Sequence, residues 1–215
     1  MQPLERPTVR WLCEHMPDRV TPDVLTATGV FGAILIFIGY VLSSRTPAFL
    51  WLANFGLIVH WFGDSLDGTL ARFRKIERPR YGYFVDHGTD VLAEVIMTLG
   101  LGLSSFVRFE TACLALIVFL MLSILTFLRA QISGVLEVAF FGIGGTEVRI
   151  GIFLLNIGMF LLPPRPVVVL WAPLTLVDCG LLVVTAMGFA FFLIGLWREA
   201  GQLAAEYPRP RQARD

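Results

Sequence analysis

Charged residues are scarce in this sequence, and it contains three cysteines. Only 16% of the 215 residues are charged, whereas 56% are hydrophobic. An average soluble domain carries about 25% charged residues, so the composition excludes an ordinary soluble protein. Cys13, Cys113 and Cys179 lie far apart without the spacing of a disulfide framework or a metal site, and we expect them to pack as small apolar side chains. Nucleotide-binding P-loops, internal repeats and low-complexity tracts are also absent.

Long apolar runs fill most of the chain. A helix needs about 20 apolar residues to cross a hydrocarbon core of roughly 30 Å. Because backbone groups cannot face lipid unpaired, these runs must be helical. We therefore predict an all-α integral membrane protein with six transmembrane helices and an N-terminal interfacial amphipathic helix. The expected spans are Val24–Leu42, Ala48–Ala71, Gly82–Leu103, Thr111–Leu128, Val148–Leu162 and Val167–Trp197.

The two ends of the chain carry much of the remaining polar sequence. Residues 1–20 mix Trp11 and Leu12 with charges, which is typical of a helix that lies in the membrane interface, although a solvated leader fits about as well. Residues 206–215 are expected to form a disordered cytoplasmic tail. No second domain is visible, so the sequence predicts a single membrane domain over residues 1–215.

Basic residues predict the orientation of the chain. Arginine and lysine accumulate at the cytoplasmic ends of membrane spans. With six spans and both termini inside, only Arg45, Arg108 and Arg165 fall on the outer side. We therefore expect a multi-pass protein of the cell (inner) membrane with both termini and the active site cytoplasmic.

Acidic side chains inside the expected spans are the strongest functional signal, because ionisable groups in a membrane are costly. Asp64 and Asp67 share one face of the second span, and Asp86 and Asp90 share one face of the third. A basic turn at residues 73–81 makes these spans antiparallel neighbours, so the four carboxylates converge. Their mutual repulsion is relieved either by protonation or by a bound cation.

A hard divalent cation suits this cluster. Oxygen ligands favour Mg²⁺, Mn²⁺ or Ca²⁺, and four carboxylates suffice to bridge two ions. An internal salt-bridge cluster with Arg72 is the alternative. Arg72 can also pair with phosphate oxygens, and Gly68 and Gly82 let ligand atoms approach the backbone, with Ala71 keeping the same face open. These residues suit a pyrophosphate substrate.

The pattern Asp64-x2-Asp67-Gly68-x2-Ala71-Arg72-x9-Gly82-x3-Asp86-x3-Asp90 resembles the signature of the CDP-alcohol phosphotransferase (CDP-alcohol phosphatidyltransferase) family, class I. The resemblance implies six transmembrane helices, a short interfacial helix and a homodimer. It implies two Mg²⁺ or Mn²⁺ ions with Asp90 as general base. The implied metal ligands are Asp64, Asp67, Asp86 and Asp90. The residues that would bind CDP are Asp67, Gly68, Ala71, Arg72 and Gly82.

The implied reaction belongs to phospholipid biosynthesis. An acceptor hydroxyl attacks the phosphorus distal to cytidine, and CMP leaves. CDP-diacylglycerol is the expected donor, because a lipid-linked compound can enter the site laterally from the bilayer. Arg129, Arg149 and Arg198 stand at cytoplasmic helix ends, where they either bind an acceptor phosphate or simply satisfy the positive-inside rule. Membrane lipids are expected partners, and nucleic acid is not.

Two other functions stay open. The segment from Gly145 to Arg149 faintly resembles the choline- and ethanolamine-phosphotransferase branch, which uses CDP-aminoalcohols and a diacylglycerol acceptor. Glu137 and Glu147 in the same region either contact an amine or hydroxyls, or serve as solvated or capping residues. A divalent cation transporter would also place acids within helices, but a conduction path needs polar groups through the whole membrane depth.

Several further polar residues have structural roles in this interpretation. The segment Thr21-Pro-Asp-Val-Leu-Thr26 resembles the opening of the family's first span, with Asp23 in place of asparagine, and Thr21 is expected to cap the helix. Asp178 is expected to form an interhelical hydrogen bond, with Asn156 as a candidate neighbour. His60 and His87 are expected to pack beside or support the aspartates.

Overall fold

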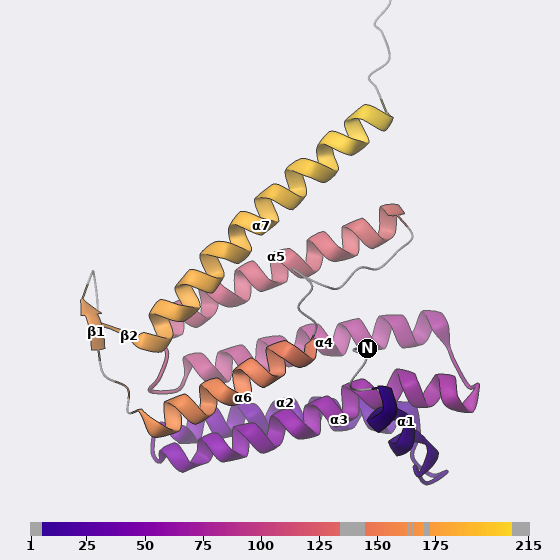
Figure 1. Ribbon diagram of the computed structural model, residues 1–215, viewed down its shortest axis with the longest axis horizontal. Coiled ribbons are helices and arrows are strands. Elements are labelled where there is room, and N and C mark those ends of the chain that lie inside the picture. The colour runs from indigo at the N-terminus through magenta and orange to yellow at the C-terminus, as the bar shows by residue number, and fades with distance from the viewer. Residues whose placement is uncertain (1–5, 134–144, 163, 165, 170–172, 208–215) are drawn as a thin grey trace, which may run out of the picture.

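A computed structural model describes residues 6–133, 145–162, 164, 166–169 and 173–207. Long helices account for most of this structure (Figure 1), so the predicted all-α class is confirmed. The helices are α1 (Arg6–Glu14), α2 (Pro22–Ser43), a short 3₁₀ turn (Pro47–Phe49), α3 (Leu50–Arg74), α4 (Pro79–Gly102), α5 (Phe109–Ser133), α6 (Gly145–Leu161) and α7 (Leu176–Glu206).

Among the described residues, three helices are long and apolar enough to cross a membrane. They are Pro22–Ser43, Phe109–Ile132 and Leu176–Glu206, which correspond to α2, most of α5 and α7. α3 and α4 contain 25 and 24 residues but carry the acidic residues of the proposed site. α6 contains 17 residues. The structure agrees with a multi-pass membrane protein, and the count of six spans stays a prediction.

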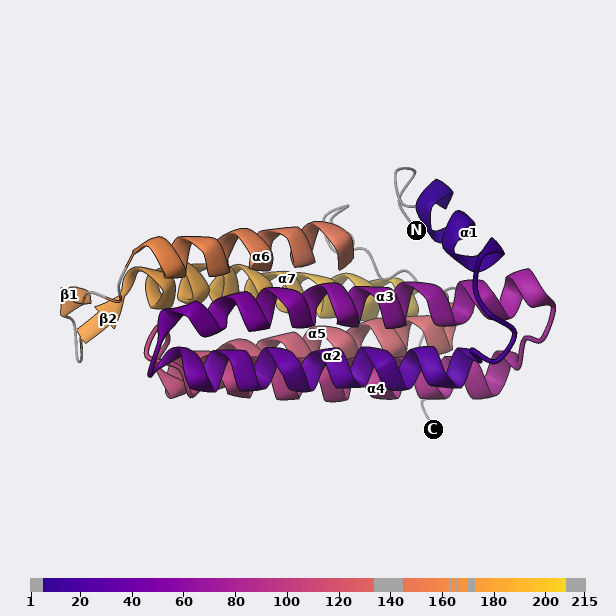
Figure 2. The same cartoon turned by 90° about the horizontal axis from the view of Figure 1, so that it is seen from below.

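The start of the expected sixth span is not helical. Helix was predicted from Val167, but Pro166–Val169 and Pro173–Thr175 pair as an antiparallel hairpin, β1 and β2. Proline offers no backbone N–H to a helix, and valine favours extended backbone. α7 begins only after the hairpin, where Thr175 and Asp178 form a capping box. Figure 2 shows the hairpin at the opposite end of the bundle from α1.

The first long helix begins as the sequence predicted. The Thr21 side chain accepts a hydrogen bond from the backbone N–H of Val24 at 3.3 Å, and Pro22 stands in the first turn of α2. Asp23 forms an ion pair with Arg78, the residue that precedes α4. This exposed pair joins the starts of α2 and α4.

The short N-terminal helix packs on the end of α3. Val9 and Cys13 of α1 are buried against Leu66 and Leu70 of α3. Trp11 points away from this contact and is 56% exposed. α1 is therefore attached to the bundle through one apolar face, and the opposite face is left for solvent or lipid headgroups.

A single arginine fixes the connection between α1 and α2. The Arg74 guanidinium, in the last turn of α3, donates hydrogen bonds to the carbonyl oxygens of Met16, Pro17 and Val20 at 2.9, 2.9 and 2.6 Å. Because a guanidinium has five N–H donors in a rigid fork, one side chain can satisfy several carbonyls of one turn. The chain segment before α2 is thereby tied to the end of α3.

α2 and α3 pack with their backbones in close approach. A methyl group added to Gly32 would lie 2.4 Å from the backbone nitrogen of His60, and one added to Gly63 would lie 2.3 Å from that of Gly29. Small residues let helices approach closely where lipid provides no hydrophobic driving force for their association. This contact sets the distance between α2 and the acidic residues of α3.

A buried polar network attaches α6 to the same pair of helices. The Asn156 amide of α6 donates to the side-chain oxygen of Asn54 on α3 at 2.8 Å, and it accepts a hydrogen bond from the Tyr40 hydroxyl of α2 at 3.0 Å. All three side chains are buried. Interhelical hydrogen bonds of this kind fix how α6 lies against α3.

α5 and α7 form a second pair beside this core. At one end the Asp178 carboxylate accepts a hydrogen bond from the backbone N–H of Arg108, just before α5, at 2.9 Å. At the other end Arg129 of α5 pairs with Glu199 of α7 at 2.9 Å. Asp178 thus ties α7 to the segment before α5 through a backbone group. This replaces the interhelical bond that was predicted, and the candidate neighbour Asn156 bonds Asn54 and Tyr40. Figure 1 shows α7 reaching away from α2 and α3.

The close contact of α2 and α3 predicts the effect of a single methyl group. We expect Gly32→Ala to destabilise the protein by about 1–3 kcal/mol. The added methyl group would clash with backbone atoms of α3, which cannot move aside as a flexible side chain can. Thermal unfolding in detergent is the measurement. Gly180→Ala is the matched control, since a methyl group there meets nothing within 4 Å. Equal unfolding temperatures for the two variants would contradict the packing argument.

Candidate metal centre

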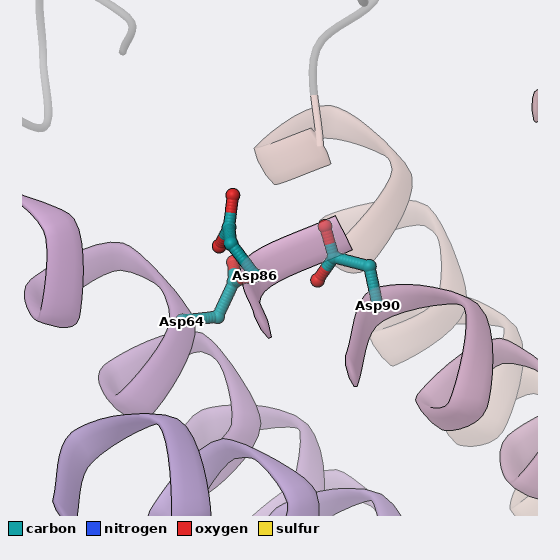
Figure 3. A group of neighbouring side chains, drawn as sticks. All are labelled: Asp64, Asp86 and Asp90. Atoms are coloured by element: carbon teal, nitrogen blue, oxygen red, sulfur yellow. The ribbon is translucent and has the colours of Figure 1, made fainter. Parts of the chain in front are cut away.

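Three aspartates from two helices converge at a partly buried place in the bundle. Asp64 comes from α3, and Asp86 and Asp90 come from successive turns of α4. One carboxylate oxygen of each lies within 4.8 Å of those of the other two, and all three side chains are partly buried. Figure 3 shows these carboxylates gathered in the space between the two helices. The convergence of acids predicted from the sequence is therefore present for these three residues.

The turn between α3 and α4 produces this arrangement. α3 ends at Lys75 in the left-handed conformation, with φ of 56°, and the backbone N–H of Ile76 donates to the carbonyl of Ala71 at 3.0 Å. This pattern closes a helix end and reverses the chain direction. α4 then starts at Pro79, where a missing N–H costs no helical hydrogen bond. The short turn brings the two acidic stripes back toward each other. The prediction that these two helices pack directly as neighbours is corrected, because α4 packs mainly against α2 and hardly against α3, and α2 contacts both.

Asp67, the fourth aspartate, is held differently. Its Oδ2 accepts a hydrogen bond from the Thr26 hydroxyl of α2 at 2.7 Å, and its Oδ1 accepts one from the backbone N–H of Gly68 at 2.5 Å. The residue is only 7% exposed. It lines the same cavity as the other three acids but is not part of their close group. The cavity is lined by Thr26, Gly29, Val30, His60, Asp64, Asp67, Asp86, Thr89 and Asp90.

The donor set of this cavity suits a hard cation. Its carboxylate oxygens come from α3 and α4, and no cysteine lines it. Carboxylates within 4.8 Å of one another repel strongly away from bulk water, and a divalent cation relieves that repulsion. Oxygen ligands of this kind favour Mg²⁺, Mn²⁺ or Ca²⁺ over zinc. The residues present therefore fit the divalent metal that the sequence pattern implied.

The residues expected to bind CDP lie on the same two helices. Arg72 is exposed, and its guanidinium donates to the Thr69 hydroxyl at 3.3 Å. A methyl group on Gly68 would come within 3.4 Å of that guanidinium, whereas one on Gly82 would meet nothing within 4 Å. Ala71 is half-buried. Gly82 thus leaves open space at the start of α4, and the role of these residues in CDP binding stays a prediction.

Only one of the three arginines proposed for the acceptor contacts the acids. Arg149 of α6 forms an ion pair with the Asp64 carboxylate, and both side chains are largely buried. Arg129 instead pairs with Glu199, a partner that the sequence did not suggest. Arg198 is exposed on α7. The structure therefore separates Arg149, which contacts the acidic group, from Arg129, which pairs with a glutamate of α7.

The two histidines take supporting positions near the acids. His60 is buried, and its Nδ1 lies 3.1 Å from the carbonyl oxygen of Gly29 on α2. His87 stacks on Tyr83 with ring centroids 4.3 Å apart, and its Nδ1 lies 3.3 Å from the Asp86 carboxylate. Both placements agree with the expectation that these rings pack beside the aspartates.

The two glutamates considered for acceptor binding remain untested. Glu147 stands in the first turn of α6, where an acid suits the positive end of a helix. Glu137 lies outside the described residues. The sequence did not identify Thr26 as a partner of the acids, because its motif suggested only a helix start. Thr26 and Asp67 are 41 positions apart, so no local sequence pattern predicts their hydrogen bond.

Comparisons with known proteins agree with this geometry. The family model for CDP-alcohol phosphatidyltransferase matches residues 19–192. Archaetidylinositol phosphate synthase of Methanothermobacter thermautotrophicus is 29% identical over 187 residues, which cover 86% of this chain and 86% of that protein. Cholinephosphotransferase 1 of Danio rerio is 28% identical over 96 residues, 42% of this chain and 25% of that protein. The Gallus gallus cholinephosphotransferase 1 is 29% identical over 106 residues, 46% of this chain and 31% of that protein.

The family match covers far more than half of the chain and includes every residue of the aspartate pattern. The relative from M. thermautotrophicus aligns over nearly the whole of both chains, whereas the two cholinephosphotransferases align over a minor part of their own length. The chain therefore belongs to the CDP-alcohol phosphatidyltransferase family of membrane enzymes, which use divalent metals to make phospholipids from CDP-alcohol donors.

Proposed function

We propose that this enzyme transfers a phosphatidyl group from CDP-diacylglycerol to a hydroxyl of a phosphorylated polyol, such as inositol phosphate, and releases CMP. The observation that carries this proposal is the Arg149–Asp64 ion pair, which brings a guanidinium to the acidic centre. The relative that aligns over 86% of both chains is a synthase of an inositol phosphate lipid, which favours the same class of acceptor.

Arg149 has the chemistry to bind the acceptor phosphate. A guanidinium carries five N–H donors and no acceptor, and the pair with Asp64 leaves several donors for further oxygens. Arginine recognises phosphate through two parallel hydrogen bonds, which orients the bound group as well as attracting it. A phosphate held at Arg149 would bring the attached polyol hydroxyls toward Asp90.

The proposed metal ligands are Asp64, Asp67, Asp86 and Asp90, which would hold two Mg²⁺ or Mn²⁺ ions. Bound ions of this kind neutralise a pyrophosphate and stabilise negative charge on the departing oxygen. Asp67, Gly68, Ala71, Arg72 and Gly82 would bind the CDP part of the donor. Gly82 supports this role because the space next to it is open, and Arg72 because its guanidinium is exposed.

Asp90 is the proposed general base. Its carboxylate would accept the proton of the polyol hydroxyl, whose oxygen then bonds to the phosphorus distal to cytidine. The bond from that phosphorus to the bridging oxygen breaks, and CMP leaves with the electron pair. A carboxylate that also binds a metal is a weak base, so part of its contribution is the positioning of the hydroxyl.

The proposed topology has six transmembrane helices, with α3, α4 and α6 joining the three apolar ones. α3 and α4, with 25 and 24 residues, extend over more than 30 Å at about 1.5 Å per residue. Arg74, Lys75, Arg78 and Arg80 cluster at their shared turn, which favours a cytoplasmic position for that end and for the nearby acids. Both termini would then be cytoplasmic, in a homodimer in the cell (inner) membrane.

A second candidate is transfer from a CDP-aminoalcohol to diacylglycerol. The matches to two cholinephosphotransferases favour it, although they cover less than half of this chain. It is the weaker proposal, because these matches also cover less than a third of the relatives' own length. A cation transporter, the alternative from another class, is not proposed, because the family consists of transferases.

CMP release by the purified full-length protein decides among these substrates. The panel combines CDP-diacylglycerol and Mn²⁺ or Mg²⁺ with inositol-1-phosphate, glycerol-3-phosphate, inositol, serine or choline, and adds CDP-choline with diacylglycerol. We expect metal-dependent CMP release with a phosphorylated acceptor. Release only with CDP-choline and diacylglycerol would establish the second candidate instead.

Asp90→Asn tests the proposed base. We expect CMP release to fall at least about 100-fold, since general base catalysis contributes 10²–10⁴-fold. Donor binding should be partly retained, because Asp64, Asp67 and Asp86 remain. Asp18→Asn, at an exposed acid outside the cavity, is the matched control. An Asp90→Asn variant with wild-type turnover would remove Asp90 as the base.

Arg149→Gln tests the acceptor site. We expect the KM for the phosphorylated acceptor to rise about 10-fold or more, because a charged hydrogen bond contributes about 1.5–3 kcal/mol. The measurement is made at saturating metal, so that the loss of the Asp64 contact does not limit the rate. Arg10→Gln, which breaks an exposed ion pair with Glu14 on α1, is the control. An unchanged acceptor KM would refute the phosphate contact.

A further inference from the structure

Thr26 of α2 forms a hydrogen bond with Asp67, one of the proposed metal ligands. Its Oγ1 lies 2.7 Å from Oδ2 of Asp67 and 3.2 Å from the carbonyl oxygen of Pro22 in its own helix. A hydroxyl has one hydrogen and can donate to only one of these at a time. The shorter distance and the negative charge favour the carboxylate, since hydrogen bonds to ionised acceptors are shorter and stronger.

The Asp67 carboxylate is fixed at both oxygens. Thr26 holds Oδ2, and the backbone N–H of Gly68 holds Oδ1 at 2.5 Å. Asp67 is itself buried, and Leu66 and Leu70, which neighbour it on α3, are fully buried. A carboxylate has about four lone-pair sites, so two remain for a metal ion. The orientation of those two sites depends on the two hydrogen bonds.

The contact between α2 and α3 holds the Thr26 hydroxyl in place. One turn after Thr26, the backbones of Gly29 and Gly63 are in close approach, and His60 Nδ1 lies 3.1 Å from the Gly29 carbonyl oxygen. α2 therefore cannot slide along α3 without breaking these contacts. The donor that orients Asp67 comes from a rigid neighbouring helix and not from a mobile loop.

We infer that Thr26 is a positioning residue, which orients the Asp67 carboxylate for one of two divalent metal ions. This inference rests on the proposed role of Asp67 as a metal ligand. Hydrogen bonds from neighbouring groups orient metal ligands, and their loss typically weakens metal binding about 10- to 100-fold. Asp64, Asp86 and Asp90 form a group without Asp67, so an ion bound by those three alone is expected to depend less on Thr26.

Mn²⁺ binding to the purified full-length protein tests this assignment without turnover. Free Mn²⁺ is measured by electron paramagnetic resonance during titration of wild type, Thr26→Val and Thr26→Ser. Valine keeps the size of threonine and removes the hydroxyl, whereas serine keeps the hydroxyl. We expect Thr26→Val to weaken one of two Mn²⁺ sites about 10- to 100-fold and Thr26→Ser to restore it.

The matched control is Thr28→Val on the same helix, because the Thr28 hydroxyl donates to the Val24 carbonyl of its own helix, at 2.8 Å. Thermal unfolding of each variant shows whether the fold is kept, and the Mn²⁺ concentration that gives half-maximal CMP release should shift with the weakened site. Wild-type affinity in Thr26→Val, or equal loss in Thr26→Ser, would overturn the role of Thr26 alone. A wild-type protein that binds no Mn²⁺ would overturn the metal centre itself, and the inference with it.

Discussion

The close approach of the α2 and α3 backbones is the constraint on which the rest of the site depends. The contact involves glycine on both helices, where an added methyl group would lie 2.3–2.4 Å from a backbone nitrogen. In a membrane the hydrophobic effect does not press helices together, so such close van der Waals contact is a main source of their association. At this spacing the Thr26 hydroxyl reaches Asp67, and the His60 ring reaches the Gly29 carbonyl.

α2 packs against α4 as well as α3, and together with the turn between α3 and α4 this brings acidic side chains close to one another. Three carboxylates from α3 and α4 are brought within 4.8 Å of one another in a partly buried cavity. Arg149 offsets part of this charge from the side of α6, which is itself attached to α3 and α2 by the buried Asn156 network. The remaining negative charge suits divalent cations and, through them, the pyrophosphate of a CDP-linked donor. The helices that hold the fold together, α2, α3, α4 and α6, therefore also supply the charged groups of the site or their supports.

Much of the centre could be predicted from the sequence, because the signal is local. Helical periodicity alone places Asp64 with Asp67, and Asp86 with Asp90, on single faces, and a short turn brings the second helix back antiparallel to the first. The cap at Thr21 is equally local. The sequence did not predict that α4 would pack mainly on α2 and hardly on α3. The hairpin before α7 was not predicted. Its sequence is apolar and rich in valine, so its hydropathy resembles that of a membrane helix, and the prolines that disfavour a helix there were given too little weight.

The sequence by itself determined the family, the helical class and the acidic pattern, since each depends on residues a few positions apart. Tertiary structure alone decided which long-range partners those acids have. Thr26 bonds Asp67 across 41 positions, and Arg149 pairs with Asp64 across 85. Arg149 and Arg129 were both expected at cytoplasmic helix ends. Only the tertiary structure shows that Arg149 pairs with Asp64 and Arg129 with Glu199. Such contacts depend on the angles at which helices cross, and the periodicity of a single helix does not reveal those angles.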